Sequence, residues 1–136
     1  HWEHFHHQAD IGIRGIGDSL EDAFEQTAIA LMEVVCNAKS VKPDQCVNIK
    51  CRCEDIELLL VDWLNEIIFE LATRGMLFSK FEVKIVDQEL TAKVWGEKAD
   101  PKKHETAVEV KGATYTQLEV KKGDDNKWVA QCVVDV

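Results

Sequence analysis

Apolar residues recur at helical spacing in two stretches of the first half of the chain. Residues 19–36 carry apolar side chains at intervals of three and four, and residues 55–73 carry a wider apolar stripe. Ser19 with Asp22 resembles a capping box at the start of the first stretch. Gly75 is well placed to end the second stretch as a left-handed residue. The pattern therefore predicts two helices, of which the second is the main core helix.

Alternating apolar and polar positions predict strands around these helices. One short strand over residues 11–16 precedes the first helix, and a half-buried strand over residues 47–53 separates the two. The second half is rich in alternation, which predicts strands at 81–85, 90–94, 108–120 and 128–136, with turns near Asp87 and over 123–126. Helices followed by consecutive strands predict an α+β fold, in which one compact domain over 1–136 packs two helices on a mostly antiparallel sheet.

Length and charge narrow the class of protein. The chain has 136 residues, which suits one domain. Its formal charge is −9 and its pI is near 5.0, which argues against autonomous binding along a phosphate backbone. No apolar run approaches the ~20 residues of a membrane span, and residues 1–7 lack the apolar core of a signal peptide. We therefore expect a cytoplasmic protein that binds no membrane and meets RNA only through a partner.

The five cysteines do not follow a zinc-site pattern. They are Cys36, Cys46, Cys51, Cys53 and Cys132. The number is odd and no CxxC pair occurs, although Cys51 and Cys53 form a CxC. We expect reduced, structural thiols rather than a zinc or redox site.

The two ends of the sequence carry candidate metal ligands. His7 and Asp10 precede a predicted strand and would place an imidazole and a carboxylate at one loop. Asp135 is followed by Val136, whose α-carboxylate would add a second hard oxygen ligand of the kind that calcium, magnesium and manganese prefer. From spacing alone, solvated chain ends are the commoner explanation, although the apolar residues 128–134 predict an anchored end.

Other polar residues are more simply explained as solvated. His104 lies in a Lys-Lys-His-Glu stretch and is expected in an exposed loop. Asp62 and Glu66 are four apart on the polar side of the second helix, as in an exposed acidic face. Lys121 and Lys122 are expected at a solvated strand end. P-loop, GxSxG and dinucleotide-binding motifs are absent, which disfavours those enzyme classes.

Six strings in order resemble one family, archease. They are HQADIGI (7–13), GDSLEDAF (17–24), LVDWLNE (60–66), WGE (95–97), EVKGATY (109–115) and VDV (134–136). The resemblance spans nearly the whole chain and implies a compact α+β domain with some likeness to a heat-shock chaperone. The chain departs from the family pattern at Gln8, usually Thr, and at Gly112, usually a bulkier residue.

The resemblance also implies a function. Archeases are accessory factors of the tRNA-splicing RNA ligase, and they promote its GTP-dependent guanylylation and repeated turnover without being the catalyst. The resemblance implies that Asp10, Asp135 and Val136 bind a divalent metal ion, which would be calcium, magnesium or manganese. Further matches, which would support the metal ligands or contact the partner, are His7, His104, Glu109 and Lys111.

Two other functions remain open. A small metal-dependent phosphoesterase would use the same carboxylates with His7, but few electrophilic donors accompany them. A chaperone or protein-modulating adaptor would need a sizeable exposed apolar patch, and the sequence pattern shows no obvious one.

Overall fold

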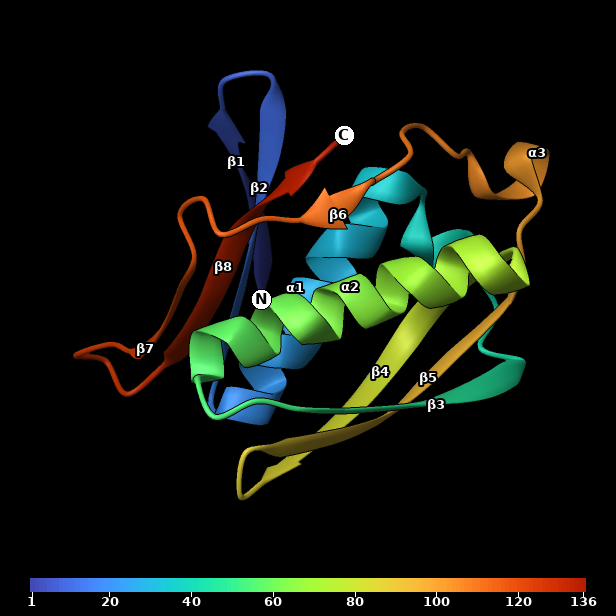
Figure 1. The fold of residues 1–136 in the computed structure, drawn as a ribbon. Helices are drawn as coiled ribbons and strands as arrows, with labels where there is room; N and C mark the ends of the chain where they lie inside the picture. The colour runs from blue at the N-terminus through green and yellow to red at the C-terminus, as the bar shows by residue number, and fades with distance from the viewer.

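Two antiparallel β-sheets and two long helices make up the computed structural model, which describes residues 1–136 (Figure 1). The larger sheet has the order β1 (Trp2–His7), β2 (Asp10–Gly17), β8 (Trp128–Asp135) and β6 (Gly112–Ala113), and β7 (Glu119–Lys122) also pairs with β8. The smaller sheet has the order β3 (Gln45–Arg52), β5 (Glu89–Lys98) and β4 (Met76–Val86). The helices are α1 (Leu20–Val35), α2 (Ile56–Arg74) and the short α3 (Pro101–His104), with a 3-10 turn, η1, at Ala38–Ser40.

The two predicted helices are confirmed, and local capping explains their ends. Ser19 Oγ accepts a hydrogen bond from the Asp22 amide at 3.0 Å at the start of α1. Asp55 caps α2 in the same way. Gly75 ends α2 with φ +62°, a conformation that glycine adopts without steric cost. None of the helices combines the length and the apolar character that crossing a bilayer requires.

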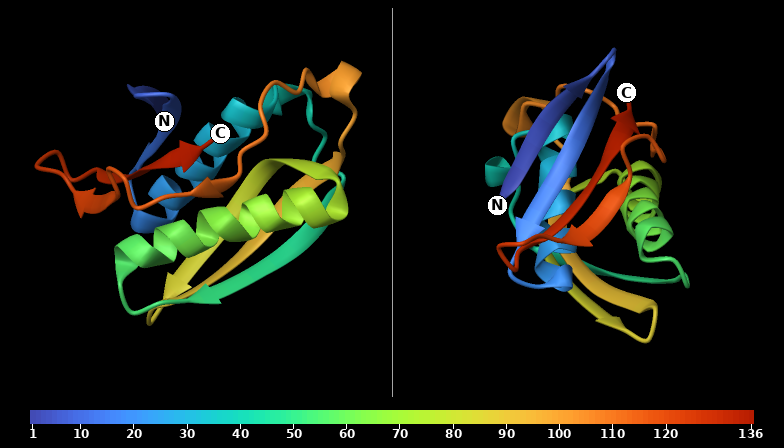
Figure 2. Two further views of the ribbon diagram at one scale, coloured as in Figure 1. Left: turned by 45° about the horizontal axis from the view of Figure 1, so that its top comes forward. Right: turned by 90° about the vertical axis from the view of Figure 1, so that its left-hand side faces the viewer.

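Both long helices contact both sheets and share one core (Figure 2). The core is a cluster of 30 buried residues. Trp63 of α2 is fully buried within it. Its indole N–H donates to the Phe24 carbonyl oxygen of α1 at 3.1 Å, and its ring meets Phe81 edge-on at 6.2 Å. Trp63 therefore links α2 to α1 and to the smaller sheet.

The N-terminal segment forms a strand that the sequence analysis did not predict. β1 pairs with β2 across a hairpin whose turn is made by Gln8 and Ala9. Its alternate residues Phe5 and His7 share one face, while His4 reaches the Ala30 carbonyl oxygen of α1 at 2.8 Å through Nε2. The histidine-rich start is therefore an ordered edge strand.

The predicted long strand over 108–120 is wrong. Residues 105–111 form no helix or strand, β6 has two residues, and a turn with Gln117 at φ 55° precedes β7. Long-range hydrogen bonds set the path of this segment. The Ala113 amide donates to Asn65 Oδ1 of α2 at 2.9 Å, and the Thr114 hydroxyl donates to the Val133 carbonyl oxygen of β8. The predicted strands at 81–85 and 90–94 are confirmed within the longer β4 and β5.

Candidate functional site

His7, Asp10 and Asp135 lie in one row across the larger sheet. His7 pairs with Asp10 in the β1–β2 register, and Ile11 pairs with Val134, so continuing the β2–β8 register by one residue sets Asp10 opposite Asp135. Directly opposed residues on antiparallel strands share a face. Since Ile11 packs against the core, this row faces away from it. The hairpin and the C-terminus lie at the same end of the sheet (Figure 2).

The chain end is held beside Asp10. The Val136 amide lies 3.5 Å from Asp10 Oδ1, and the Val136 side chain packs against the core. On the other side of β8, the Lys111 amide donates to the Asp135 carbonyl oxygen at 2.7 Å. The structure therefore brings together Asp10, Asp135 and Val136, which we call the terminal carboxylate site.

The donor chemistry of this site fits a hard divalent cation. The ligands that the family resemblance implies are the carboxylates of Asp10 and Asp135 and the α-carboxylate of Val136, and calcium, magnesium and manganese take oxygen ligands of this kind. No group of three or more His, Cys, Asp or Glu side chains is placed to hold a metal. A metal here would consequently need an oxygen ligand beyond the side chains of Asp10 and Asp135.

Phe5 and Arg14 support the neighbouring part of this sheet face, and the sequence analysis missed them. The Phe5 ring lies flat over Gly12, where an added Cβ would come within 2.2 Å of the ring. The Arg14 guanidinium covers the same ring at 4.7 Å and bonds to Gln131 at 2.8 Å. The alternation of residues 3–7 was the available signal for this face.

The other residues that the family resemblance singled out do not form one cluster in the structure. His7 is half-buried beside Asp10, whereas Glu109 and Lys111 are exposed on the segment between α3 and β6. Of these two, Lys111 reaches the site through its backbone. At Gly112 an added Cβ would meet only Asn65 Oδ1 at 3.7 Å, so the position does not require glycine for lack of space at the Cβ.

His104 is buried, which corrects the expectation of a solvated loop histidine. Its Nδ1 accepts from the Asp100 amide at 2.9 Å, so the neutral ring carries its hydrogen on Nε2 and donates to Glu97 Oε2 at 2.9 Å. Glu97 also accepts from Lys103 Nζ at 2.7 Å and from the Lys42 amide at 2.8 Å. These bonds, that from Lys103 above all, lower the pKa of Glu97 to about 2. The cluster fixes α3 against the smaller sheet.

The Glu97 cluster predicts a dependence of stability on pH. The folded-state pKa lies below the ordinary 4.5, so the cluster stabilises the fold above pH 4.5, and this contribution is lost as pH falls towards 2. We expect Glu97→Gln to unfold at lower urea concentration than wild type at neutral pH, with the difference shrinking below pH 4.5. Glu82→Gln, at an exposed position, is the control. A difference for Glu97→Gln that is independent of pH would contradict the assignment.

The structure also places the cysteines and the charged residues that the sequence singled out. All five cysteines are free. Burial raises the pKa of Cys36 to about 11 and that of Cys132 to about 12, and burial with nearby Asp62 and Glu66 raises that of Cys51 to about 12. These three thiols therefore stay protonated and unreactive at neutral pH. Asp62 on α2 and Lys121 and Lys122 on β7 are exposed, as predicted, whereas Glu66, the second residue of the predicted acidic face, is half-buried.

Comparisons with known proteins agree with this architecture. The archease protein family model matches residues 2–136. Protein archease of Pyrococcus abyssi is 46% identical over 139 residues, covering 99% of this chain and 98% of its own, and that of Pyrococcus furiosus is 42% identical with the same coverage.

Two solved structures share the fold. The solution structure of Protein 1598 of Methanobacterium thermoautotrophicum has a TM-score of 0.87 and 34% identity, covering 99% of this chain and 98% of its own. The crystal structure of an archease from Thermotoga maritima, described as a possible chaperone, has a TM-score of 0.67 and 21% identity, covering 97% and 94%, and supports the fold alone. The resemblance and the α+β fold predicted from the sequence are thereby confirmed, and the chain belongs to the archease family.

Proposed function

We propose that this archease activates the tRNA-splicing RNA ligase by promoting its GTP-dependent guanylylation and repeated turnover, and that the terminal carboxylate site carries this activity. The supporting observation is the Val136 amide 3.5 Å from Asp10 Oδ1, together with the β2–β8 register, whose pair Ile11–Val134 precedes Asp10 and Asp135 at the end of the sheet. Asp10 and Asp135 are far apart in sequence, yet the fold brings them close to each other and to Val136 at one end of the sheet.

The electrostatics of the site favour a bound cation. Two carboxylates about 4 Å apart repel by about 4 kcal/mol at an effective dielectric constant of about 20. Neither aspartate forms an ion pair with a Lys, Arg or His side chain. A divalent ion bound here would supply the missing positive charge. Asp10 and Asp135 would hold it, while the half-buried His7 would orient Asp10.

The acidic character of the chain suits a basic protein partner. The net charge of −9 favours encounter with a positively charged nucleotide- and RNA-binding protein, because complementary fields speed association. The terminal carboxylate site stands at the end of the sheet, next to the exposed turn at Gln8 and Ala9, where a partner protein can reach it. We place the contact with the nucleotide pocket of the ligase here.

The test is the rate of ligase–GMP formation with purified ligase, GTP and this protein. We expect Asp10→Asn and Asp135→Asn each to lower the stimulated rate at least tenfold, which corresponds to a loss of about 1.4 kcal/mol. Asp62→Asn, an exposed carboxylate on α2, is the matched control and should leave the rate unchanged. Full multiple-turnover ligation with either folded site variant would refute the carboxylate mechanism.

A protein-binding adaptor is the second candidate, and a groove favours it. An apolar groove of about 350 Å³ runs between the end of α2, residues 75–77 and residues 106–110. The sequence analysis expected no such patch, because it placed the apolar residues on regular helix and strand faces, with residues 108–110 in the strand predicted over 108–120. The relative from Thermotoga maritima is described as a possible chaperone. Suppression of the aggregation of an unrelated unfolding protein, retained in Asp135→Asn, would favour this function.

A further inference from the structure

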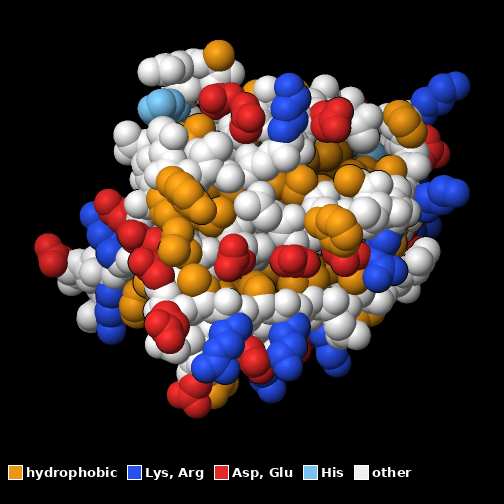
Figure 3. All heavy atoms as spheres, in the orientation of Figure 1, with side chains coloured by type: hydrophobic (Ala, Val, Ile, Leu, Met, Phe, Trp, Pro, Cys, Tyr) orange, Lys and Arg blue, Asp and Glu red, His pale blue; other side chains and the backbone are white.

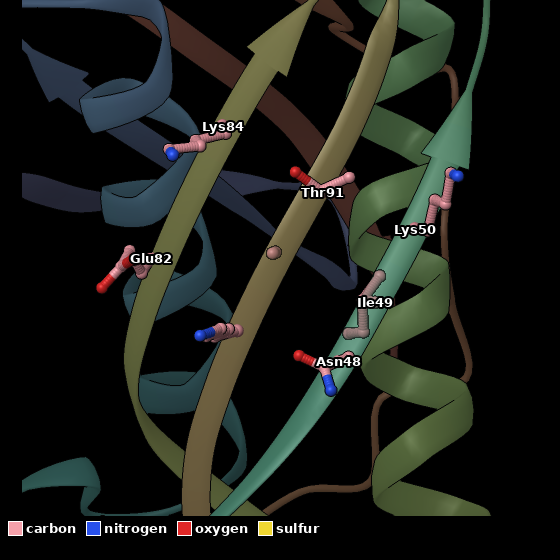
Figure 4. A pocket seen from close by; sticks show the side chains of 8 residues that line it. Asn48, Ile49, Lys50, Glu82, Lys84 and Thr91 are labelled. Carbon is pink, nitrogen blue, oxygen red and sulfur yellow. The ribbon is translucent and has the colours of Figure 1, made fainter.

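The outer face of the smaller sheet gathers positive charge on an acidic protein. In the register of β3, β5 and β4, Lys50 lies beside Thr91 and Thr91 beside Lys84, and the next row holds Lys93 with Asn48 and Glu82. Alternate residues such as Ile49 and Val83 are buried against the helices. Figure 4 shows Lys84, Thr91 and Lys50 projecting from three neighbouring strands. We define the basic sheet face as the outward residues Asn48, Lys50, Arg52, Lys80, Glu82, Lys84, Glu89, Thr91, Lys93 and Trp95.

This face opposes the charge of the rest of the molecule. It holds five cations against two carboxylates, Glu82 and Glu89, for a formal charge of +3. Because the whole chain carries −9, the remainder carries −12. In Figure 3, Lys and Arg side chains gather along the lower edge, whereas Asp and Glu lie across the front near α2. The single ion pair within the face, Lys50 to Glu89, is long at 3.7 Å.

We propose that the basic sheet face binds the phosphodiester backbone of a single-stranded nucleic acid. Proteins that hold single strands without sequence preference combine a positively charged groove with an aromatic side chain on which a base stacks. The face has a hollow of about 440 Å³ whose charged lining residues are three lysines, Lys50, Lys84 and Lys93, and one carboxylate, Glu82. One row away stands the partly exposed ring of Trp95, with Lys80 Nζ 4.6 Å from the ring centre. Lys80 is a flexible side chain, and a base would take its place on the ring.

The dimensions of the face suit a single strand rather than a duplex. Three strands at about 4.8 Å spacing place the outer two only about 10 Å apart. Lys80 and Lys84 are four residues apart on β4, which is about 13 Å along the strand. A double-stranded RNA site spans about 16 base pairs and two grooves, which this face cannot cover. A few nucleotides of one strand match its length.

The composition of the face disfavours an acidic protein as the occupant. Protein–protein interfaces are depleted in lysine at their centres and enriched in large apolar side chains. Here the central strand β5 presents Thr91 and Lys93 at the middle of the face. Thr91 and Asn48 add hydroxyl and amide donors between the lysines, which suits phosphate and sugar oxygens.

Binding of a single strand to the basic sheet face is independent of the proposed ligase activity, because it is measured on the isolated protein. The sequence analysis expected this protein to meet RNA only through a partner, because its net charge is negative. The basic sheet face instead offers a place for direct contact. Net charge reports the sum over the surface, whereas phosphate binding responds to the local field of one face.

The experiment is fluorescence anisotropy of labelled twelve-residue oligouridylate and oligothymidylate across a salt series. With three to five phosphates neutralised, the slope of log K against log salt should lie between about −2 and −3.5, with Kd between about 1 and 100 μM. The triple variant Lys50→Gln, Lys84→Gln and Lys93→Gln should make this negative slope shallower by about 2. Stronger binding of the RNA strand would identify RNA as the preferred ligand, and equal binding a general single-strand site.

A charge-matched control variant separates the face from overall charge. Lys39→Gln with Lys102→Gln and Lys122→Gln removes three exposed cations from elsewhere and reaches the same net charge. We expect this control to keep most of the wild-type slope. Equal losses in the two triple variants, tighter binding of duplex RNA, equally tight binding of polyglutamate, or no binding at low salt would each overturn the proposal.

Discussion

Replacing Trp63 with alanine is expected to lower the free energy of unfolding by about 3–5 kcal/mol, as large truncations of buried aromatic residues do. The side chain is fully buried at the junction of α2, α1 and the smaller sheet. The change removes the edge-on contact with Phe81 and the donor to the Phe24 carbonyl oxygen, and it leaves a cavity that the rigid sheet cannot fill. Urea denaturation followed by circular dichroism measures the loss.

Trp2→Ala is the matched control, because Trp2 is 36% exposed on the edge strand β1. We expect a cost below about 1 kcal/mol there, in line with surface substitutions. A stability loss for Trp63→Ala no greater than that for Trp2→Ala would show that Trp63 does not hold the core together.

Calcium is expected to stabilise the folded protein through the terminal carboxylate site. A ligand that binds only the native state adds about 2.7 kcal/mol at a hundredfold excess over its Kd. For a domain of this size that corresponds to a rise in Tm of roughly 8 °C relative to chelator. Asp10→Asn and Asp135→Asn should each remove most of the rise, since each takes away one of two opposed carboxylates.

The stability of the aspartate variants in chelator, without metal, provides an internal check. Like charges directly opposite on neighbouring strands destabilise a sheet, so Asp135→Asn should be slightly more stable than wild type without metal and less stable with it. Asp62→Asn should follow wild type in both conditions. A calcium-dependent rise in Tm that persists unchanged in Asp10→Asn would place the ion elsewhere, and manganese provides a second titration for the same comparison.

Local sequence signals were sufficient for the helices and for several strands. The capping residues Ser19 and Asp55 and the terminating Gly75 lie next to the elements they delimit, so their effect is visible within a few residues. The alternation in β4 and β5 is likewise local, because one face of each strand is buried and the other exposed.

The wrong predictions share a cause in long-range contacts. β1 is a strand because β2 offers it an edge, and the segment after α3 leaves strand geometry because Asn65 and Val133 hold it from other elements. His104 has no apolar neighbour in sequence that would mark it as buried. Its burial depends on Glu97, which lies on a different element.

The candidate site could be predicted only in part. Spacing alone left Asp10 and Asp135 as ordinary residues near chain ends, since nothing in the local pattern shows that β2 and β8 are neighbours. The family resemblance singled them out, and the sheet register supplies the physical reason for treating them together. The basic sheet face was missed because its lysines come from three separate segments and disappear within a net negative charge.

The position of β8 has a consequence for the order of assembly. This strand is made after all the other helices and strands described here, yet it lies between β2 on one side and β6 and β7 on the other. A nascent chain still lacking residues 128–136 cannot close the larger sheet, because pairing between its earliest and latest segments must wait. Such a chain also has Asp10 without Asp135, so the terminal carboxylate site cannot form before the larger sheet is closed.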